Sequence, residues 1–338
     1  MRWWVLVAAV GCAGEPADDA GKADTDAVAD DTDGVGVDTD GADTDGDTQD
    51  TGDSGDTGDS GDSGMPVDTD PPPPVPTSSA DLRATGSLTV TSSSGTLQTT
   101  SGCALSWQHF VPDGGSTAPL VVLTHGLQRS EAQMTTWAAH LASWGLEVVT
   151  PTSCHASIID LDQEQNGLDL IELAAATRAG PVIYAGHSAG GLASWVAASR
   201  DANAVGLFGL DPVEFNTLGA TASPDIGVRT YAVTGDDSTC NGFGNQPALI
   251  DAVAGSTRLY VVDADHCDFE VPTGPLCTLV CGRSTNARFT EVEIRDTVRG
   301  LLTSALLDLA GLDPTAAATW WTPGGAWFDW METTGRVR

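Results

Sequence analysis

Short runs of apolar residues recur along the chain beyond residue 118, and polar or small residues separate them. Two earlier segments, 87–93 and 104–111, alternate between apolar and polar positions only in part and predict strands that precede the series. The later runs contain little alternation, which is typical of strands buried on both faces of a parallel sheet. The runs predicted to be strands are 120–124, 146–150, 181–185, 204–210, 229–235 and 258–264.

Segments with helical character lie between and after these runs, at 131–145, 167–180, 190–200, 246–255 and 289–311. Because strands and helices alternate, the sequence predicts an α/β domain with a mostly parallel central sheet and helices on both faces. We place this domain at residues 81–338, a length sufficient for one large core. The tryptophan-rich stretch 320–331 is expected to pack on the domain, and an exposed apolar patch is the alternative.

The first twelve residues, MRWWVLVAAVGC, combine one positive charge, a short apolar run and a small residue before a cysteine. This pattern is typical of a signal peptide, and the run is too short to cross a bilayer as a mature helix. It resembles a bacterial lipoprotein signal, which would make residues 1–11 the signal peptide and Cys12 the lipidated first residue. Simple secretion is the alternative. We therefore expect an exported protein, either a lipoprotein of the outer membrane or cell surface, or a secreted protein.

Residues 12–80 differ in composition from the remainder of the chain. The first eighty residues hold 20 of the 47 acidic residues but only two basic ones, and PPPPVP follows at 71–76. A segment with so few apolar side chains and so much like charge cannot bury enough surface to order itself. We expect a disordered tether. The stretch DTDGADTDGD is superficially similar to a calcium-binding EF-hand loop, but its glycine and glutamate positions do not match.

Residues 81–338 are also acidic, with 27 acidic against 12 basic residues. Nucleic-acid binding needs a basic surface, so we expect no nucleic-acid partner. Six cysteines remain when Cys12 is set aside, and an even number in an exported protein predicts disulfides whose pairing the sequence does not determine. Zinc is the alternative, because Cys277 and Cys281 have a C-x3-C spacing, but no matching second pair follows. The disulfide candidates are Cys103, Cys154, Cys240, Cys267, Cys277 and Cys281.

The stretch AGHSAGG contains a G-x-S-x-G motif at residues 186–190, directly after a predicted strand and before a predicted helix. This context suits a nucleophilic serine on a strained strand-to-helix turn, so Ser188 is the candidate nucleophile. The start of the following helix also directs amide dipoles at an oxyanion. An acyl-transfer serine needs two oxyanion donors, and we expect the backbone amides of Ala189 and Leu127 in that role.

The catalytic base is expected after the nucleophile in the chain. Of the six histidines only His266 lies beyond Ser188, and it follows the last predicted strand. His125 precedes the serine and adjoins the oxyanion loop, so we assign it a supporting role. The acid remains open between Asp211, after the strand at 204–210, and Asp236 or Asp237, after the next strand.

The segment from about Pro119 to Gly311 resembles the α/β-hydrolases, and more narrowly the chlorophyllase and cutinase-like polyester hydrolase group. HGLQRSEAQMTTWAAHLASWGLEVVTPTS is similar to that group's oxyanion loop with the following helix and strand. GHSAGG is similar to its nucleophile elbow, and ADHCDFE to the segment around its histidine. GLDPVE resembles the acid segment of chlorophyllases and pancreatic-type lipases, which favours Asp211. The cutinase-like branch takes its acid from the next strand, which would mean Asp236 or Asp237.

These residues together predict a serine hydrolase that cleaves carboxylic esters through an acyl-enzyme intermediate, without a metal or organic cofactor. The expected partners are a hydrophobic ester substrate and a membrane reached through the N-terminal lipid. A peptidase or amidase would use the same triad, and a non-catalytic surface binding protein on a hydrolase scaffold is a further alternative. No large insertion between the strands resembles a lid, so we expect an open, shallow pocket.

The stretch DADHCDFE, at 263–270, places His266 and Cys267 among four carboxylates. We expect Cys267 to fix this loop through a disulfide rather than to bind metal. Asp268 and Glu270 are expected to be loop-shaping or surface groups.

Overall fold

The computed structural model describes residues 73–274, 277, 280–281 and 287–338. The expected signal peptide at 1–11, the lipidation site Cys12 and nearly all of the expected tether at 12–80 lie outside the described residues.

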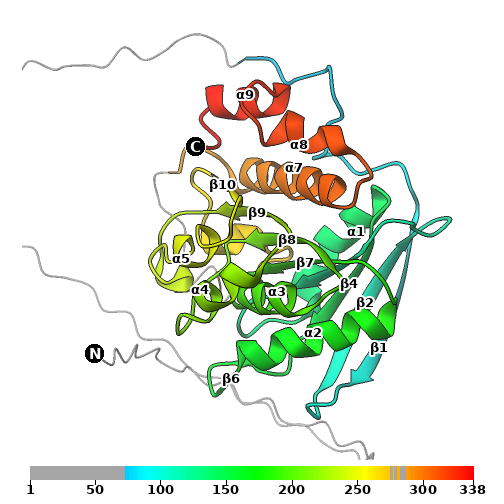
Figure 1. Cartoon of the computed structure of the whole chain (residues 1–338). Coiled ribbons are helices and arrows are strands. Elements are labelled where there is room, and N and C mark those ends of the chain that lie inside the picture. The colour runs from blue at the N-terminus through cyan, green and yellow to red at the C-terminus, as the bar shows by residue number, and fades with distance from the viewer. Residues whose placement is uncertain (1–72, 275–276, 278–279, 282–286) are drawn as a thin grey trace, which may run out of the picture. The chain divides into compact units, whose positions relative to one another are not determined.

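A central sheet of eight strands organises the domain (Figure 1). Its strands are β1 Val90–Gln98, β2 Ala104–Pro112, β3 Leu120–Thr124, β4 Glu147–Thr152, β7 Val182–His187, β8 Ala204–Leu210, β9 Arg229–Thr234 and β10 Thr257–Tyr260. The order in the sheet is β1-β2-β4-β3-β7-β8-β9-β10, and only the pairs β1–β2 and β2–β4 are antiparallel. The predicted α/β class with a mostly parallel sheet is confirmed. The short strands β5 Ala156–Ser157 and β6 Asp160–Leu161 form a separate hairpin.

Helices cover both faces of the sheet (Figure 1). The α-helices are α1 Thr135–Ser143, α2 Gln163–Thr177, α3 Ser188–Arg200, α4 Leu218–Ala222, α5 Pro247–Ile250, α7 Glu291–Leu309, α8 Pro314–Trp320 and α9 Ala326–Thr333. The short 3-10 helices are η1 Glu131–Met134, η2 Ser223–Asp225, η3 Thr239–Asn241 and η4 His266–Phe269. One apolar core joins the sheet to α1 and α7–α9, and a second joins its other face to α2 and α3.

The central strands contribute to both cores at once. In β3, Val121 and Leu123 belong to the core under α1 and α7, while Leu120 and Val122 belong to the core under α2 and α3. Successive side chains of a strand point to opposite faces, so a strand covered on both sides must be apolar at every position. This explains why the runs in the sequence lack alternation.

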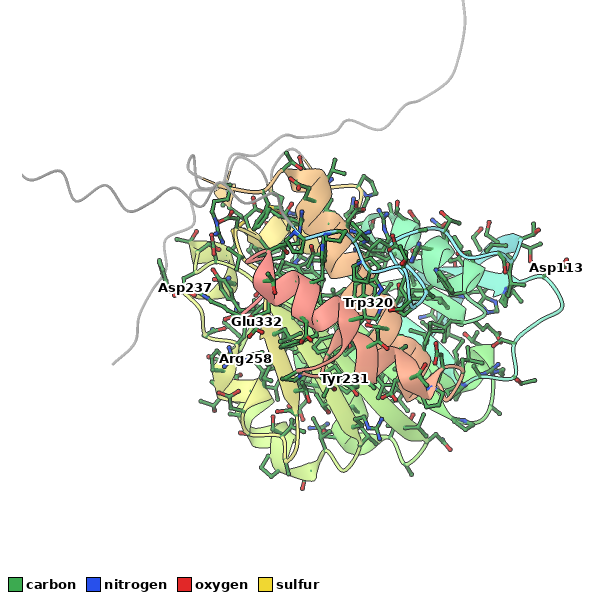
Figure 2. All side chains as sticks on the ribbon, turned by 90° about the horizontal axis from the view of Figure 1, so that it is seen from above. Asp113, Tyr231, Asp237, Arg258, Trp320 and Glu332 are labelled. Atoms are coloured by element: carbon green, nitrogen blue, oxygen red, sulfur yellow. A yellow bond between two sulfur atoms is a disulfide. The ribbon has the colours of Figure 1, made fainter. Side chains whose placement is uncertain are left out.

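The tryptophan-rich C-terminal stretch packs on the domain, as predicted. Trp320 of α8 and Trp327 of α9 are both buried, and their rings stack with centroids 4.4 Å apart. In the view of Figure 2 Trp320 lies near the centre, whereas Asp113 and Asp237 lie at the periphery. The indole N–H of Trp330 donates to the carbonyl of Pro73, so α9 also holds the start of the described chain.

Two predicted elements are shorter than the pattern suggested. The helix expected at 246–255 is limited to α5, after which the chain turns through Val253 and Gly255. The strand expected at 258–264 ends as β10 at Tyr260, and the C-terminal residues then pair beside it. Asp263 has φ +62°, which a continuing strand does not allow.

The six cysteines of the domain form three disulfides, as predicted: Cys103–Cys154, Cys240–Cys281 and Cys267–Cys277. The C-x3-C pair that suggested zinc is divided between two of these bonds. Disulfides persist in oxidising compartments, which indicates that the protein works outside a reducing cytosol. Within the described ranges, no helix combines the length and apolar character needed to cross a membrane.

Candidate active site

Ser188 lies at the sharp turn between β7 and α3, at the carboxyl end of the central strands. Its φ is +56°, a left-handed conformation that is costly for a residue with a side chain. The two glycines of the motif make the turn possible. A Cβ on Gly186 would lie 2.4 Å from the carbonyl oxygen of Gly190, and one on Gly190 would lie 2.1 Å from that of His125. Only glycine fits at these two contacts.

A continuous hydrogen-bonded chain joins Ser188, His266 and Asp211. The Ser188 Oγ is 2.8 Å from His266 Nε2, and His266 Nδ1 is 2.6 Å from Asp211 Oδ2. A carboxylate accepts but does not donate, so Nδ1 carries the hydrogen and Nε2 of the neutral ring accepts from the serine hydroxyl. All three side chains are buried. The arrangement can therefore remove a proton from the serine and stabilise the resulting imidazolium.

Asp211 is fully buried and surrounded by donors. It follows β8 with φ +43°, and its amide donates to the carbonyl of Val233. Besides His266, its carboxylate accepts hydrogen bonds from the Asn241 amide at 3.2 Å, the Gly235 N–H at 3.3 Å and the Gln246 amide. These contacts fix both carboxylate oxygens. Asn241 and Gln246 were missed in the sequence, because nothing in their polar loop distinguishes them from neighbouring turn residues.

The two alternative acids lie away from the histidine ring. Asp236 is hydrogen-bonded to the Tyr260 hydroxyl, and burial together with the nearby Asp263 raises the pKa of its carboxyl group. Asp237 is exposed and lies beside Gly244 (Figure 2). Of the three carboxylates considered from the sequence, the structure thus places Asp211 against His266.

The loop after β3 lies against the nucleophile turn. A Cβ on Gly126 would be 3.0 Å from Ser188 Cβ, so the backbone that leads into Leu127 passes directly beside the serine. Ala189 occupies the first turn of α3, where backbone N–H groups have no partner within the helix. Ala189 and Gly126, the residue before Leu127, therefore adjoin Ser188.

His125 supports this loop, in keeping with the role assigned from the sequence. Its Nδ1 donates to the Gly126 carbonyl at 2.7 Å, and its Nε2 accepts from the Ser153 N–H at 3.0 Å. Burial lowers the pKa of His125 to about 4, so the ring is neutral at pH 7. A neutral ring is what this pair of contacts requires, because Nε2 must accept.

The segment that carries His266 is covalently fixed on one side. Cys267 is bonded to Cys277, and Cys281, whose N–H donates to the Cys277 carbonyl, is bonded to Cys240. Cys240 immediately precedes Asn241, which holds the Asp211 carboxylate. Cys277 and Cys281 thereby link the loop that carries His266 to the loop that orients Asp211. The sulfur atoms of Cys267, Cys277 and Cys281 lie within 4.8 Å of one another, but each is engaged in a disulfide.

The two carboxylates after His266 have different roles. Asp268 shapes the loop, because its carboxylate accepts from the Asp265 N–H at 3.0 Å in a capping box. Glu270 is not a surface group: it is 0 % exposed, and Arg129 Nε donates to its two oxygens at 3.0 and 2.9 Å. Burial raises the pKa of Glu270, and the Arg129 charge opposes that shift. The charge of Glu270 suggested an exposed side chain. The sequence around Glu270 does not reveal its partner, because Arg129 lies 141 residues away in the chain.

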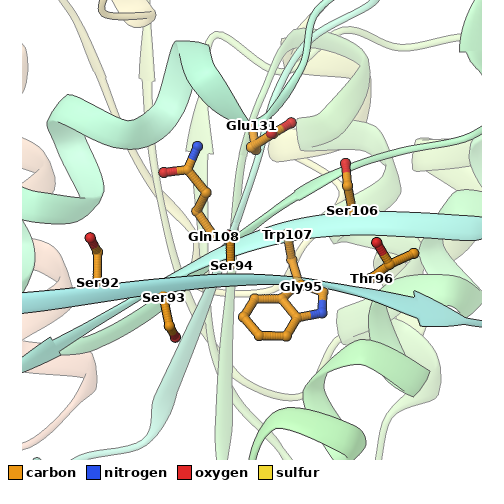
Figure 3. A pocket seen from close by; sticks show the side chains of 9 residues that line it. All are labelled: Ser92, Ser93, Ser94, Gly95, Thr96, Ser106, Trp107, Gln108 and Glu131. Atoms are coloured by element: carbon orange, nitrogen blue, oxygen red, sulfur yellow. The ribbon is translucent and has the colours of Figure 1, made fainter.

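A separate hollow lies on the strands β1 and β2 (Figure 3). It has a volume of about 580 Å³, and hydroxyl and amide side chains dominate its wall. Its lining residues are Ser92, Ser93, Ser94, Gly95, Thr96, Ser106, Trp107, Gln108 and Glu131. None of these residues belongs to the hydrogen-bonded chain of Ser188, so the hollow has no part in the chemistry of that chain.

Comparison with known proteins adds no assignment: no family model matches the chain, and no curated protein matches it.

Proposed function

We propose that this protein is a serine hydrolase of the α/β-hydrolase type that cleaves carboxylic esters. The observation that carries the proposal is the chain Ser188–His266–Asp211, with contacts of 2.8 and 2.6 Å, on a strained turn between a central parallel strand and a helix. The resemblance of the motifs to the chlorophyllase and cutinase-like polyester hydrolases supports the same activity. The eight-stranded, mostly parallel sheet is compatible with that fold.

The proposed reaction has two steps. Ser188 Oγ attacks the ester carbonyl while His266 Nε2 takes its proton, and the Leu127 and Ala189 amides stabilise the tetrahedral oxyanion. His266 then gives the proton to the leaving alcohol, which leaves the acyl group on Ser188. In the second step His266 takes a proton from water while the water oxygen attacks the acyl carbonyl. The bond to Ser188 Oγ then breaks, His266 returns the proton to that oxygen, and the carboxylic acid is released. Asp211 orients the ring and stabilises the imidazolium throughout.

The surface around the carboxyl ends of the strands supports a hydrophobic substrate. Ile159, in the β5–β6 hairpin after β4, is 94 % exposed, and Phe243, in the loop after β9, is 72 % exposed. Phe215, in the loop after β8, is also exposed. Because the strands are parallel here, these loops lie at the same end of the sheet as Ser188. These three exposed apolar side chains, at the end of the sheet that carries Ser188, are the ground on which we propose esters with apolar acyl or alcohol groups.

The proposal is tested with the purified protein and p-nitrophenyl esters of increasing chain length, with p-nitroanilides as the amide comparison. We expect ester hydrolysis that exceeds anilide hydrolysis and that disappears in Ser188→Ala. Hydrolysis of equal rate in Ser188→Ala would show that another group is responsible. Anilide hydrolysis faster than ester hydrolysis would favour a peptidase or amidase.

For localisation we propose attachment to a membrane through an acylated Cys12. Mass spectrometry of the mature N-terminus should find Cys12 as the first residue with its lipid, and an unmodified Cys12 would refute the anchor.

A further inference from the structure

His187, the variable residue of the G-x-S-x-G motif, lies against the proposed base. The His187 and His266 rings have centroids 4.6 Å apart, and His187 Nε2 is 2.9 Å from the backbone carbonyl oxygen of His266. A carbonyl only accepts, so Nε2 of His187 carries the hydrogen and donates it. The side chain that adjoins the nucleophile in sequence therefore holds the main chain of the base, 78 residues further on from Ser188.

An ion pair lies behind His187. Glu270 Oε2 is 3.9 Å from His187 Nδ1, and the same carboxylate is paired with Arg129. Arg129 follows the expected oxyanion residue Leu127 by two positions. The Arg129–Glu270 pair consequently connects the oxyanion loop to the segment that carries His266. His187 Nδ1 has no hydrogen-bond partner among the described protein groups.

Two further bonds fasten the same segment to the same side of the site. The indole N–H of Trp137 in α1 donates to the Phe269 carbonyl at 3.1 Å, and the Val271 N–H donates to the Gln133 carbonyl at 2.9 Å. The segment 266–271 is thus held at residues 269, 270 and 271 by the oxyanion loop and its helix. At residue 266 itself, the contact on the backbone carbonyl comes from His187.

We propose that His187 is a positioning residue for His266, and that the Arg129–Glu270 pair fixes the segment 266–271, which carries His266. This inference rests on the proposed hydrolase function, because it assigns His187 an effect on proton transfer between Ser188 and His266. The His187 donor sets where the His266 backbone lies, and the backbone sets where Nε2 meets the serine hydroxyl. Displacement of a reacting group by about 1 Å can cost about a hundredfold in rate.

The neutral form of His187 suits this role. Burial and the nearby His266 lower the pKa of His187 well below its usual value. The ring acts through its N–H and not through a charge, so a neutral side chain with a donor at the same place should replace it.

Two substitutions separate the hydrogen bond from the space that the ring fills. His187→Gln retains an N–H donor at a similar distance from its own backbone. The methionine of His187→Met is similar to glutamine in length and flexibility, but it has no such donor. Each variant is compared with the wild type and with Ser188→Ala in hydrolysis of a short, soluble p-nitrophenyl ester. The end point of fluorophosphonate labelling counts the folded, competent sites, and rates are given per labelled site.

We expect His187→Met to lower kcat per labelled site by about 10- to 100-fold with KM changed by less than about threefold, and His187→Gln to stay within about fivefold of the wild type. Equal kcat in the wild type, His187→Met and His187→Gln would overturn the inference and leave the hydrolase function intact. An equal loss in both variants would overturn it too, because the donor would then be irrelevant. A wild type that neither hydrolyses esters nor labels at Ser188 would overturn the hydrolase function and the inference together.

Discussion

At the scale of single residues, Asp211 is a fully buried carboxylate, and a buried charge must be compensated by hydrogen bonds. Asp211 has His266, Asn241, Gln246 and the Gly235 amide around it. The order of the strands narrowed the acid to three positions at two strand ends, and the resemblance of GLDPVE to known acid segments favoured Asp211 among them. Which carboxylate contacts the His266 ring depends on the conformations of the loops after β8 and β9. Those conformations depend on side chains such as Asn241, whose role cannot be recognised from the neighbouring sequence.

Replacing Asp211 by asparagine should remove the partner that fixes the His266 tautomer. An amide can donate to Nδ1, which would place the ring hydrogen on Nε2 and leave no acceptor for the serine proton. We expect kcat of Asp211→Asn to fall by about 10³- to 10⁴-fold, as in other triads. Asp236→Asn is the matched control and should change kcat by less than about threefold. Steady-state kinetics checks both, and the reverse order would assign the acid to Asp236.

Glu270 allows a second prediction at this scale, on stability. Glu270→Gln leaves the largely buried Arg129 without a counter-charge, and breaking a buried ion pair commonly costs about 3–5 kcal/mol. The exposed pair of Arg200 and Glu164 provides the control, since Glu164→Gln should cost less than about 1 kcal/mol. Urea denaturation measures both. Similar costs for the two variants would contradict the structural importance given to the Glu270 pair.

At the scale of elements, the candidate site is held by the short helix η4 and by the disulfides of Cys277 and Cys281. Residue patterns predicted long elements such as α3 and α7 well. The capping box of Thr290 and Glu293 begins α7, and its apolar face follows helical spacing. Single turns such as η4 have too few residues for any periodicity. Their conformation is imposed by capping side chains and disulfides, whose pairing is a property of the folded chain.

The Cys267–Cys277 bond should therefore affect activity more than the Cys103–Cys154 bond, which adjoins neither His266 nor Asp211 in the chain. Replacing either disulfide by two serines is expected to cost about 2–4 kcal/mol of stability, because both bonds constrain the unfolded chain. Cys267→Ser with Cys277→Ser should in addition lower kcat by about tenfold or more, since His266 adjoins the released residue. Cys103→Ser with Cys154→Ser is the comparison. Cys154 follows Ser153, which contacts His125 and not His266, so the fall in kcat below the unfolding temperature should be smaller. Equal kcat in the two variants would exclude a special role for the bond beside the base.

At the scale of the whole molecule, the sequence predicted a sheet with helices on both faces, because strands buried on both faces are apolar at nearly every position. A sheet covered on both sides needs apolar runs, and β3, β7 and β8 carry them. The candidate base was also found from the sequence, because His266 is the one histidine that lies beyond Ser188 and it follows the last predicted strand. The network of Arg129, Glu270 and His187 could not be predicted, because a charged residue reads as a surface group until its partner across the fold is known.

Buried histidines predict how the stability of the whole molecule depends on pH. The folded-state pKa values of His125 and His140 are lowered to about 4 from 6.5, mainly by burial. Between pH 6.5 and 4 the unfolded chain binds these protons and the folded chain does not, so stability falls as pH falls. Each histidine should cost about 2 kcal/mol between pH 7 and pH 5.

His140→Gln tests this dependence, because glutamine can still donate to the Leu82 carbonyl but does not titrate. The free energy of unfolding, measured by urea denaturation at pH 7 and pH 5, should fall less in the variant than in the wild type by about 2 kcal/mol. An identical loss in both proteins would show that His140 is not neutral in the folded state.

The central claim is that Ser188 is a nucleophile activated by His266, and covalent labelling tests it most directly. The intact protein is incubated with a fluorophosphonate, and the modified residue is identified by mass spectrometry. The expected result is one adduct on the peptide that contains Ser188, lost in Ser188→Ala and slowed by about 10³-fold or more in His266→Ala. An unlabelled protein, or an adduct elsewhere that persists in Ser188→Ala, would contradict the claim.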